Sequence, residues 1–167
     1  MKGIVLYSSK TGNTEKMAKS IYDAIKDLGD ISLEKINGQM NLEGYDFALI
    51  GSWIDKGTLE KSTLTLVHKV KGKKIGLFGT LGAQPESKHG QDVYHTLESL
   101  LEEESLGVYL CPGLVDPKLK ENLKRIPEHV LPKHIVDQMM EASITSRYAT
   151  DEELEKAGKY FKEKLRG

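Results

Sequence analysis

The chain has 167 residues, of which 38% are hydrophobic and 29% charged, and its formal net charge is −1. This length fits one domain with a sizeable core, and the composition is typical of a globular protein rather than a disordered or membrane protein. The balanced charge gives no electrostatic basis for binding nucleic acid. The single cysteine, Cys111, excludes an internal disulfide and a cysteine-rich metal site.

No apolar stretch approaches the length of a membrane span, and the first apolar run, Ile4–Tyr7, is too short for a signal peptide. We therefore expect a cytoplasmic protein. The five histidines show no metal-ligand spacing, so no metal site is expected. Cys111 ends an apolar run, where a small core residue is expected rather than a redox thiol.

Short apolar runs alternate with amphipathic patterns along most of the chain. Continuous apolar runs, typical of strands buried on both faces, are found at 3–7, 45–51, 74–79 and 106–111. The segment 31–36 alternates apolar and polar residues, which predicts a strand nearer an edge of the sheet. The pattern therefore predicts five strands.

Amphipathic patterns between these runs predict helices that begin near Thr14, after Thr58 as N-cap, and near Val93. A capping box at Thr150–Glu153 indicates the start of a final helix. Strands that alternate with helices imply right-handed crossovers and a parallel sheet. The predicted fold class is therefore α/β, with a doubly wound sheet.

The segment from about 115 to 149 interrupts this alternation, because it contains two short helical patterns and no strand pattern. The first pattern places Leu119, Leu123 and Ile126 on one face, and the second begins near Pro132. No flexible linker flanks the segment. We therefore expect a helical elaboration packed on the same domain, which spans residues 1–167.

The segment after the first strand, residues 8–15, is rich in hydroxyl groups and opens directly onto a helix. The start of a helix presents free backbone N–H groups and a positive dipole end, and Gly12 lets the backbone bend closely around a ligand. Hydroxyl groups that can add donors belong to Ser8, Ser9, Thr11 and Thr14. The segment predicts either a phosphate site or an ordinary capped turn.

In an open parallel sheet, ligands bind beyond the carboxyl ends of the strands. Three loops that bear glycine follow such ends, at Ser8–Thr14, Gly51–Gly57 and Gly79–Pro85. The second loop contains Trp53, the only tryptophan, which is either a platform for a flat ring or part of the core. The third loop offers small residues and backbone donors. A phosphate site, a flat ring and such a loop together suggest flavin mononucleotide (FMN).

The chain resembles the flavodoxin family over most of its length, apart from the helical elaboration. Ser9–Glu15 matches the phosphate-loop pattern S/T-x-T-G-x-T of that family, while Gly51 and Phe78–Thr80 stand where its two flavin-flanking loops begin. The resemblance implies a flavodoxin-like, five-stranded parallel sheet in the order 2-1-3-4-5, with the extra helical segment after strand 5. It also implies tightly held FMN and transfer of one or two electrons through the exposed ring edge.

Three features depart from the family pattern. Family members commonly stack a tyrosine from the third loop on the outer flavin face, but Ala83–Glu86 has no aromatic residue. Trp53 or His89 then covers that face, or it stays open. Charges in the segments 52–61 and 80–92 are nearly balanced rather than strongly acidic, so a very low potential is not implied. Lys10 replaces a small residue and either pairs with the phosphate or is solvated.

The W-x-D-K-G pattern at Trp53–Gly57 is similar to that of short flavodoxin-like proteins of anaerobic bacteria. Some members of that group resemble companions of larger flavin reductases, including bile-pigment reductases. No nucleophile elbow and no ATP-type phosphate loop occurs in the sequence. The acidic cluster that a signalling receiver domain needs after its first strand is also absent.

The sequence therefore predicts an FMN-binding electron-transfer protein that docks on a redox partner protein. The alternatives are an FMN-dependent reductase or oxidase acting on a planar substrate, such as a quinone or tetrapyrrole, and a binding module without flavin. The Lys56–Gly57 peptide is a candidate for a backbone flip toward flavin N5, which glycine permits. The predicted cofactor-binding residues are Ser9, Lys10, Thr11, Gly12, Asn13, Thr14, Trp53, Ile54, Asp55, Lys56, Gly57, Thr80, Leu81, Gly82 and Ala83.

Overall fold

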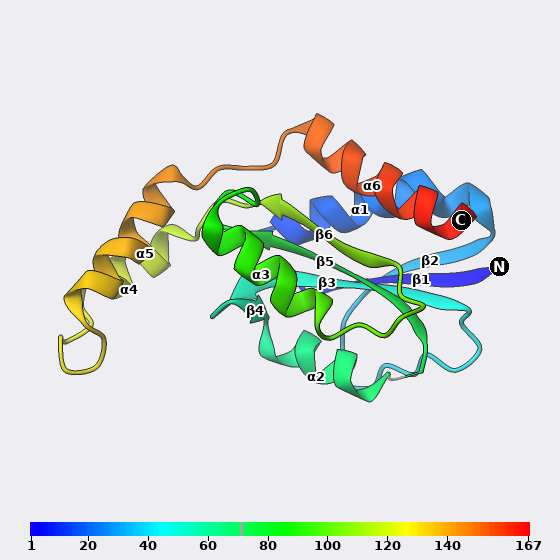
Figure 1. Cartoon of the computed structure of the whole chain (residues 1–167), viewed down its shortest axis with the longest axis horizontal. Coiled ribbons are helices and arrows are strands. Elements are labelled where there is room, and N and C mark those ends of the chain that lie inside the picture. Colours follow the sequence, from blue (N-terminus) through cyan, green and yellow to red (C-terminus); the bar gives the residue numbers. More distant parts are fainter. Residues whose placement is uncertain (71) are drawn as a thin grey trace.

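A parallel sheet forms the centre of the molecule in the computed structural model, which describes residues 1–70 and 72–167 (Figure 1). Its strands, in spatial order, are β2 (Asp30–Lys35), β1 (Lys2–Tyr7), β3 (Phe47–Asp55), β5 (Lys74–Leu81) and β6 (Gly107–Pro112). This order confirms the one that the family resemblance implies, and β2 lies at an edge as expected, but the sheet has a short sixth strand, β4 (Thr58–Leu59), where five were predicted. The α/β fold class is confirmed as well.

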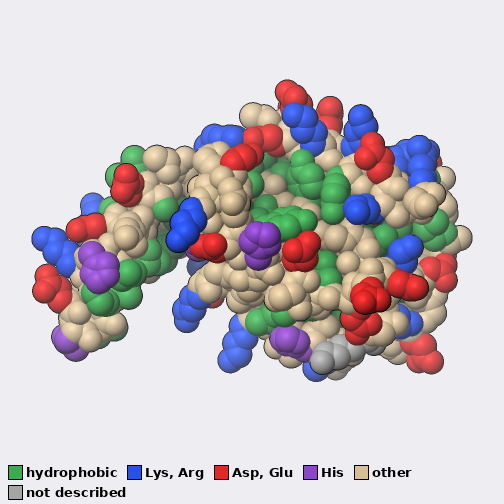
Figure 2. All heavy atoms as spheres, in the orientation of Figure 1, with side chains coloured by type: hydrophobic (Ala, Val, Ile, Leu, Met, Phe, Trp, Pro, Cys, Tyr) green, Lys and Arg blue, Asp and Glu red, His purple; other side chains and the backbone are tan. Residues whose placement is uncertain are grey.

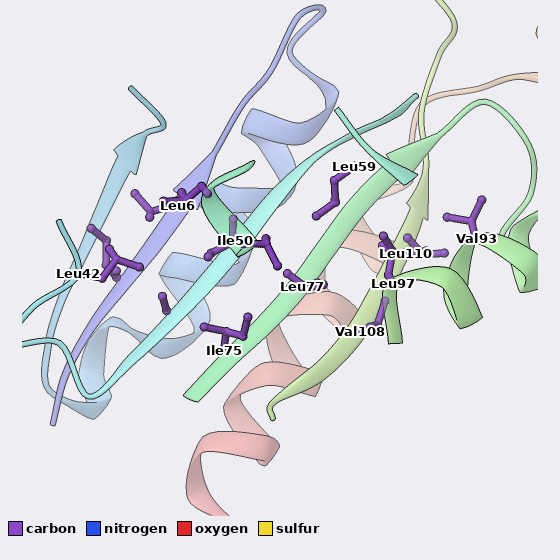
Figure 3. Packing of buried hydrophobic residues seen from close by; sticks show 14 of the residues in the cluster. Leu6, Leu42, Ile50, Leu59, Ile75, Leu77, Val93, Leu97, Val108 and Leu110 are labelled. Atoms are coloured by element: carbon purple, nitrogen blue, oxygen red, sulfur yellow. The ribbon is translucent and has the colours of Figure 1, made fainter. Parts of the chain in front are cut away.

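Helices cover both faces of the sheet (Figure 1). On one face lie α1 (Asn13–Ile25), its short 3-10 extension η1 (Lys26–Leu28), and α6 (Asp151–Arg166). On the other face lie α2 (Lys61–Lys69) and α3 (Lys88–Glu98). Figure 3 shows the core on the side of α2 and α3, which includes Ile50 and Leu77 of the central strands and Leu97 of α3. Apolar residues therefore fill both interfaces, as the continuous apolar strands require.

The expectation that Thr58 caps the second helix is wrong. Thr58 belongs to β4 (Thr58–Leu59), a two-residue strand that pairs antiparallel with the end of β3. Lys56 and Gly57 connect the two strands with φ values of 51° and 81°, which is the conformation of a tight hairpin turn. The N-cap of α2 is Glu60, whose carboxylate accepts the N–H groups of Ser62 and Thr63 at 2.9 and 2.8 Å.

The segment between β6 and α6 forms an arm made of α4 (Pro117–Lys124) and α5 (Lys133–Thr145). The two helices pack on each other and project from the body of the molecule (Figure 1), whereas the sequence led us to expect them to pack on the domain. Within the arm only Leu123 and Ser143 are buried, and Figure 2 shows hydrophobic side chains at its surface. The arm therefore has too few apolar contacts for a core of its own.

No helix in the described ranges combines the length and the apolar character that crossing a membrane requires.

Candidate functional site

A cavity of about 310 Å³ lies at the carboxyl edge of the sheet. Its walls come from the loop before α1, the β3–β4 hairpin, the end of β5 and the segment after β6. The lining residues are Lys10, Thr11, Asn13, Trp53, Ile54, Asp55, Thr80, Gly82, Gly113, Leu114, Val115, Asp116 and Leu119. The three loops selected from the sequence therefore meet in one cavity, together with a fourth segment that the sequence analysis missed.

The amino end of α1 gives the cavity a set of oriented backbone donors. Gly12 is the N-cap and adopts a left-handed conformation with φ of 92°. The Ser9 hydroxyl oxygen accepts the N–H groups of Gly12 and Glu15 at 3.1 and 3.3 Å, which fixes the loop. The amides of Asn13 and Thr14 donate no hydrogen bond within the described part of the chain. Such a helix end attracts an anionic group.

Two buried hydroxyl groups join this loop to β5. The oxygens Oγ1 of Thr14 and Thr80 lie 2.8 Å apart, and both side chains are almost fully buried. The structure therefore places the Thr14 hydroxyl against a neighbouring strand. This hydrogen bond joins the amino end of α1 to the end of β5, next to the cavity that Thr80 lines.

We expect Thr14→Val and Thr80→Val each to lower the free energy of unfolding by about 1–3 kcal/mol, because each leaves one buried hydroxyl without a partner. The double variant should lose much less than the sum, since both polar groups are then removed. Urea denaturation of the four proteins measures the coupling between the two sites. Strictly additive losses would show that the two hydroxyls do not interact.

Trp53 lies at the end of β3, where it pairs in register with Thr80 of β5. Its side chain is only half-buried and lines the cavity, so it is not a fully buried core residue. Asp55 is exposed beside it, and the turn residues Lys56 and Gly57 lie beyond the cavity wall. The hairpin therefore presents an aromatic surface to the cavity and a glycine-containing turn next to it.

Several residues selected from the sequence surround the cavity without lining it. Leu81 is buried in the core under α2 and α3, and Ala83 packs against that core. His89, which the sequence analysis considered as a cover for the flavin, is exposed in α3 and is not among the lining residues. The predicted residues outside the lining are Ser9, Gly12, Thr14, Lys56, Gly57, Leu81 and Ala83.

The fourth wall is the segment Gly113–Asp116, which we call the strap, together with Leu119 of α4. The strap continues from β6, and its first N–H, that of Gly113, donates to the carbonyl of Leu81 at 2.8 Å. Its position follows from the same rule that selected the other loops, because it leaves the carboxyl end of a strand. Pro112 and Gly113 are residues that typically end a strand, so the sequence contains a signal for this loop, but the prediction includes only the loops after the first, third and fourth strands.

Arg147 holds the third loop in place from the far end of the arm. Its guanidinium donates to the side-chain oxygen of Gln84 at 3.1 Å and to both carboxylate oxygens of Glu153 at 2.7 and 2.9 Å. Glu153 also accepts the N–H of Thr150 in the predicted capping box, which the structure confirms. The hydrogen bond from Arg147 and its charge lower the pKa of Glu153 from 4.5 to about 2.

We expect Glu153→Gln to destabilise the protein at neutral pH by less than about 1 kcal/mol, because both side chains of the ion pair are partly exposed to solvent. A carboxyl whose pKa is lower in the folded chain stabilises the fold above its unfolded pKa. That contribution is therefore complete above pH 4.5 and is lost as the pH falls toward 2. Unfolding curves of the two proteins should converge at low pH. A difference independent of pH would exclude the charge as its cause.

The fold and this site define a class of α/β proteins with a ligand cavity between a helix amino end and two strand ends. A family model described as "Flavodoxin domain" matches residues 4–162. The flavodoxin-like domain-containing protein BilS of Clostridioides difficile (strain CD3) is 34% identical to this chain, over 97% of this chain and 95% of the relative. The chain therefore belongs to the flavodoxin family, which confirms the resemblance inferred from its phosphate loop.

Two further proteins agree with this assignment. A flavodoxin of Megasphaera elsdenii is 34% identical over 47% of this chain and 64% of its own length. The crystal structure of oxidised flavodoxin 2 from Bacillus cereus covers 99% of both chains with a TM-score of 0.58, at 17% identity, and thus shows the shared fold. With the family established, the cofactor is FMN, as the sequence predicts.

The residues at the cavity are compatible with FMN. The unpaired backbone amides at the start of α1 lie next to an unobstructed surface at the left-handed Gly12, because nothing lies within 4 Å of the place where a Cβ on Gly12 would stand. That surface fits a phosphate group. Trp53, Ile54 and Leu119 give the adjoining walls the apolar character that a flat ring requires.

Proposed function

We propose that this protein is an electron-transfer flavodoxin that binds one FMN in this cavity and exchanges electrons with a redox partner protein. The observation that carries the proposal is the meeting of the amino end of α1, the Trp53 hairpin and the end of β5 around a single cavity. FMN supplies the one- and two-electron chemistry, and the chain supplies binding, orientation and the local electrostatics. We also propose that residues 1–167 form one domain and that the protein is cytoplasmic.

The phosphate of FMN is assigned to the loop before α1. The backbone amides of Thr11, Asn13 and Thr14 are the donors, while that of Gly12 is bonded to Ser9, and the dipole of α1 is directed at the anion. Hydroxyl groups of Ser9 and Thr11 stand in the same loop, and the ammonium group of Lys10 adds a positive charge at the cavity wall. These groups hold the phosphate through hydrogen bonds and charge without a metal ion.

The ring is assigned to the space between the hairpin and the third loop. Trp53, Ile54 and Asp55 form one side, while Thr80 and Gly82 form the other, with Leu81 and Ala83 anchoring that loop in the core. The Lys56–Gly57 peptide is the group that would turn its N–H or C=O toward the ring. Both residues already adopt positive φ, so the turn depends on glycine at position 57.

A second candidate function is direct reduction or oxidation of a planar substrate, such as a quinone or a tetrapyrrole, without a partner protein. One observation favours it: the strap and Leu119 of the arm add an aliphatic wall to the cavity. Such a wall is typical of a pocket that holds an apolar ligand.

The test begins with FMN titration of the purified apoprotein, which should give one binding site and a yellow holoprotein. Absence of binding would contradict both functions. The photoreduced holoprotein is then mixed anaerobically with an electron acceptor. The acceptor is either an oxidised redox protein that accepts electrons from flavodoxins or a quinone. Fast transfer to the protein acceptor and slow reaction with NAD(P)H plus quinone or tetrapyrrole support the carrier. Rapid turnover of NAD(P)H with those small molecules alone would favour the second function.

A further inference from the structure

The strap and the first turn of α4 are attached to the cofactor cavity rather than merely passing beside it. The side-chain amide of Asn13 donates through Nδ2 to the carbonyl of Leu114 at 3.1 Å, which joins the phosphate loop to the strap. The N–H of Val115 donates to the hydroxyl of Ser146 at 3.1 Å, at the other end of the arm. These bonds, together with that of Gly113 to β5, fix the path of the strap at several points.

Small residues in the neighbouring loops make room for this path. A Cβ on Gly82 would lie 2.4 Å from Cγ2 of Val115, so the side chain of Val115 fills the space that any larger residue at position 82 would need. A Cβ on Gly113 would lie 3.2 Å from the Cβ of Thr80 and 3.4 Å from the Cγ of Asn13. The third loop and the strap therefore pack closely against each other.

Leu119 is the lining residue of α4, and the body of the protein leaves much of it uncovered. Its side chain is 44% exposed although it lines the cavity, whereas Leu123, one turn later on the same helix, is buried between the helices of the arm. When an apolar ligand covers an exposed leucine, the burial of apolar surface lowers the free energy of the complex. The third loop offers no aromatic side chain to cover a flat ring, and Val115 and Leu119 line the same cavity as this loop.

We propose that Val115 and Leu119 are cofactor-contacting residues, which cover the flavin ring with aliphatic side chains where family members use an aromatic one. This inference rests on the proposed binding of FMN in the cavity. In this arrangement the arm restricts access of solvent to the ring. The hydrogen bonds that join the strap to Asn13 and Ser146 hold the arm in this position. The aliphatic cover of the ring is therefore supplied by the helical elaboration, beside the contacts of Thr80 and Gly82 in the third loop.

The inference is tested with Val115→Ala, Leu119→Ala and the double variant. Val130→Ala serves as the matched control, because Val130 is 65% exposed in the same arm and does not line the cavity. All these side chains are at least partly exposed, so the variants should fold, which circular dichroism verifies. The dissociation constant of FMN is measured by flavin fluorescence, and exposure of bound FMN is measured by iodide quenching.

We expect each single variant to weaken FMN binding about 3- to 10-fold, since removing methyl groups from an apolar contact has an effect of about 1 kcal/mol. The double variant should bind about 10- to 100-fold more weakly and leave the bound FMN more open to iodide, while Val130→Ala stays within about twofold of the wild type. If the wild type binds FMN and the double variant matches it in both readouts, the inference is wrong and the proposed function stands. If the wild type binds no FMN, both are wrong.

Discussion

Replacement of Gly12 by valine is expected to weaken FMN binding by on the order of a hundredfold. Gly12 has φ of 92°, a conformation in which a β-branched residue is strained by about 1–3 kcal/mol. Relief of that strain turns the amides of the phosphate loop away from their common target. A valine side chain at this place would also occupy the open surface where the phosphate is assigned. Titration of the apoprotein with FMN, followed by flavin fluorescence, measures the loss.

Gly44→Val is the matched control for this variant. Gly44 also has positive φ, 82°, and a Cβ placed on it would meet nothing within 4 Å. However, it precedes the amino end of β3, whereas the cavity lies at the carboxyl ends of the strands. Its replacement should reduce the free energy of unfolding by a similar amount and leave FMN binding unchanged. Equal losses of affinity in the two variants would mean that Gly12 acts only through overall stability, and that the phosphate is bound elsewhere.

The second large effect is expected at Gly90, in the first turn of α3. A Cβ there would lie 2.3 Å from the carbonyl oxygen of Pro85 and 2.5 Å from that of Gln84. Both obstacles are backbone atoms, which cannot rotate aside as a side chain does. We therefore expect Gly90→Ala to lower the free energy of unfolding by about 3 kcal/mol or more, at the upper end of the range for overpacked sites. Urea denaturation of the apoprotein measures this change.

The same substitution should also affect the cofactor site, because the displaced residues, Gln84 and Pro85, belong to the third loop. We expect weaker FMN binding even in conditions where the variant is fully folded. Gly38→Ala is the control, since Gly38 is exposed and has open space around it, and its replacement should change the stability by less than about 0.5 kcal/mol. A Gly90→Ala protein as stable as this control would contradict the packing described for α3.

Most of the fold could be predicted from the sequence because strand burial leaves a direct pattern. The runs 3–7 and 45–51 are apolar on both faces, as central parallel strands must be, and the alternating segment 31–36 became the edge strand β2. The hairpin at Lys56–Gly57 was missed because only the second of its turn residues is a strong turn former. The N-cap at Glu60 was missed because glutamate is not among the preferred capping residues.

The candidate site was likewise predicted only in part from the sequence. Three of its loops were found because strand ends and glycines are visible in the sequence. The contacts that determine its shape depend on the tertiary structure: Asn13 meets a residue 101 positions away, and Thr14 meets Thr80. The placement of the arm was mispredicted because its helical pattern shows an apolar face without showing what covers it.

The central claim is that FMN lies between the amino end of α1 and the Trp53 hairpin. The most direct measurement is an FMN titration of 15N-labelled protein followed by NMR, in which the single tryptophan gives one indole signal. We expect that signal and the amide signals of Thr11, Gly12, Asn13 and Thr14 to shift together and to saturate at one equivalent of FMN. Saturable shifts confined to other residues, with these five signals unmoved, would contradict the account.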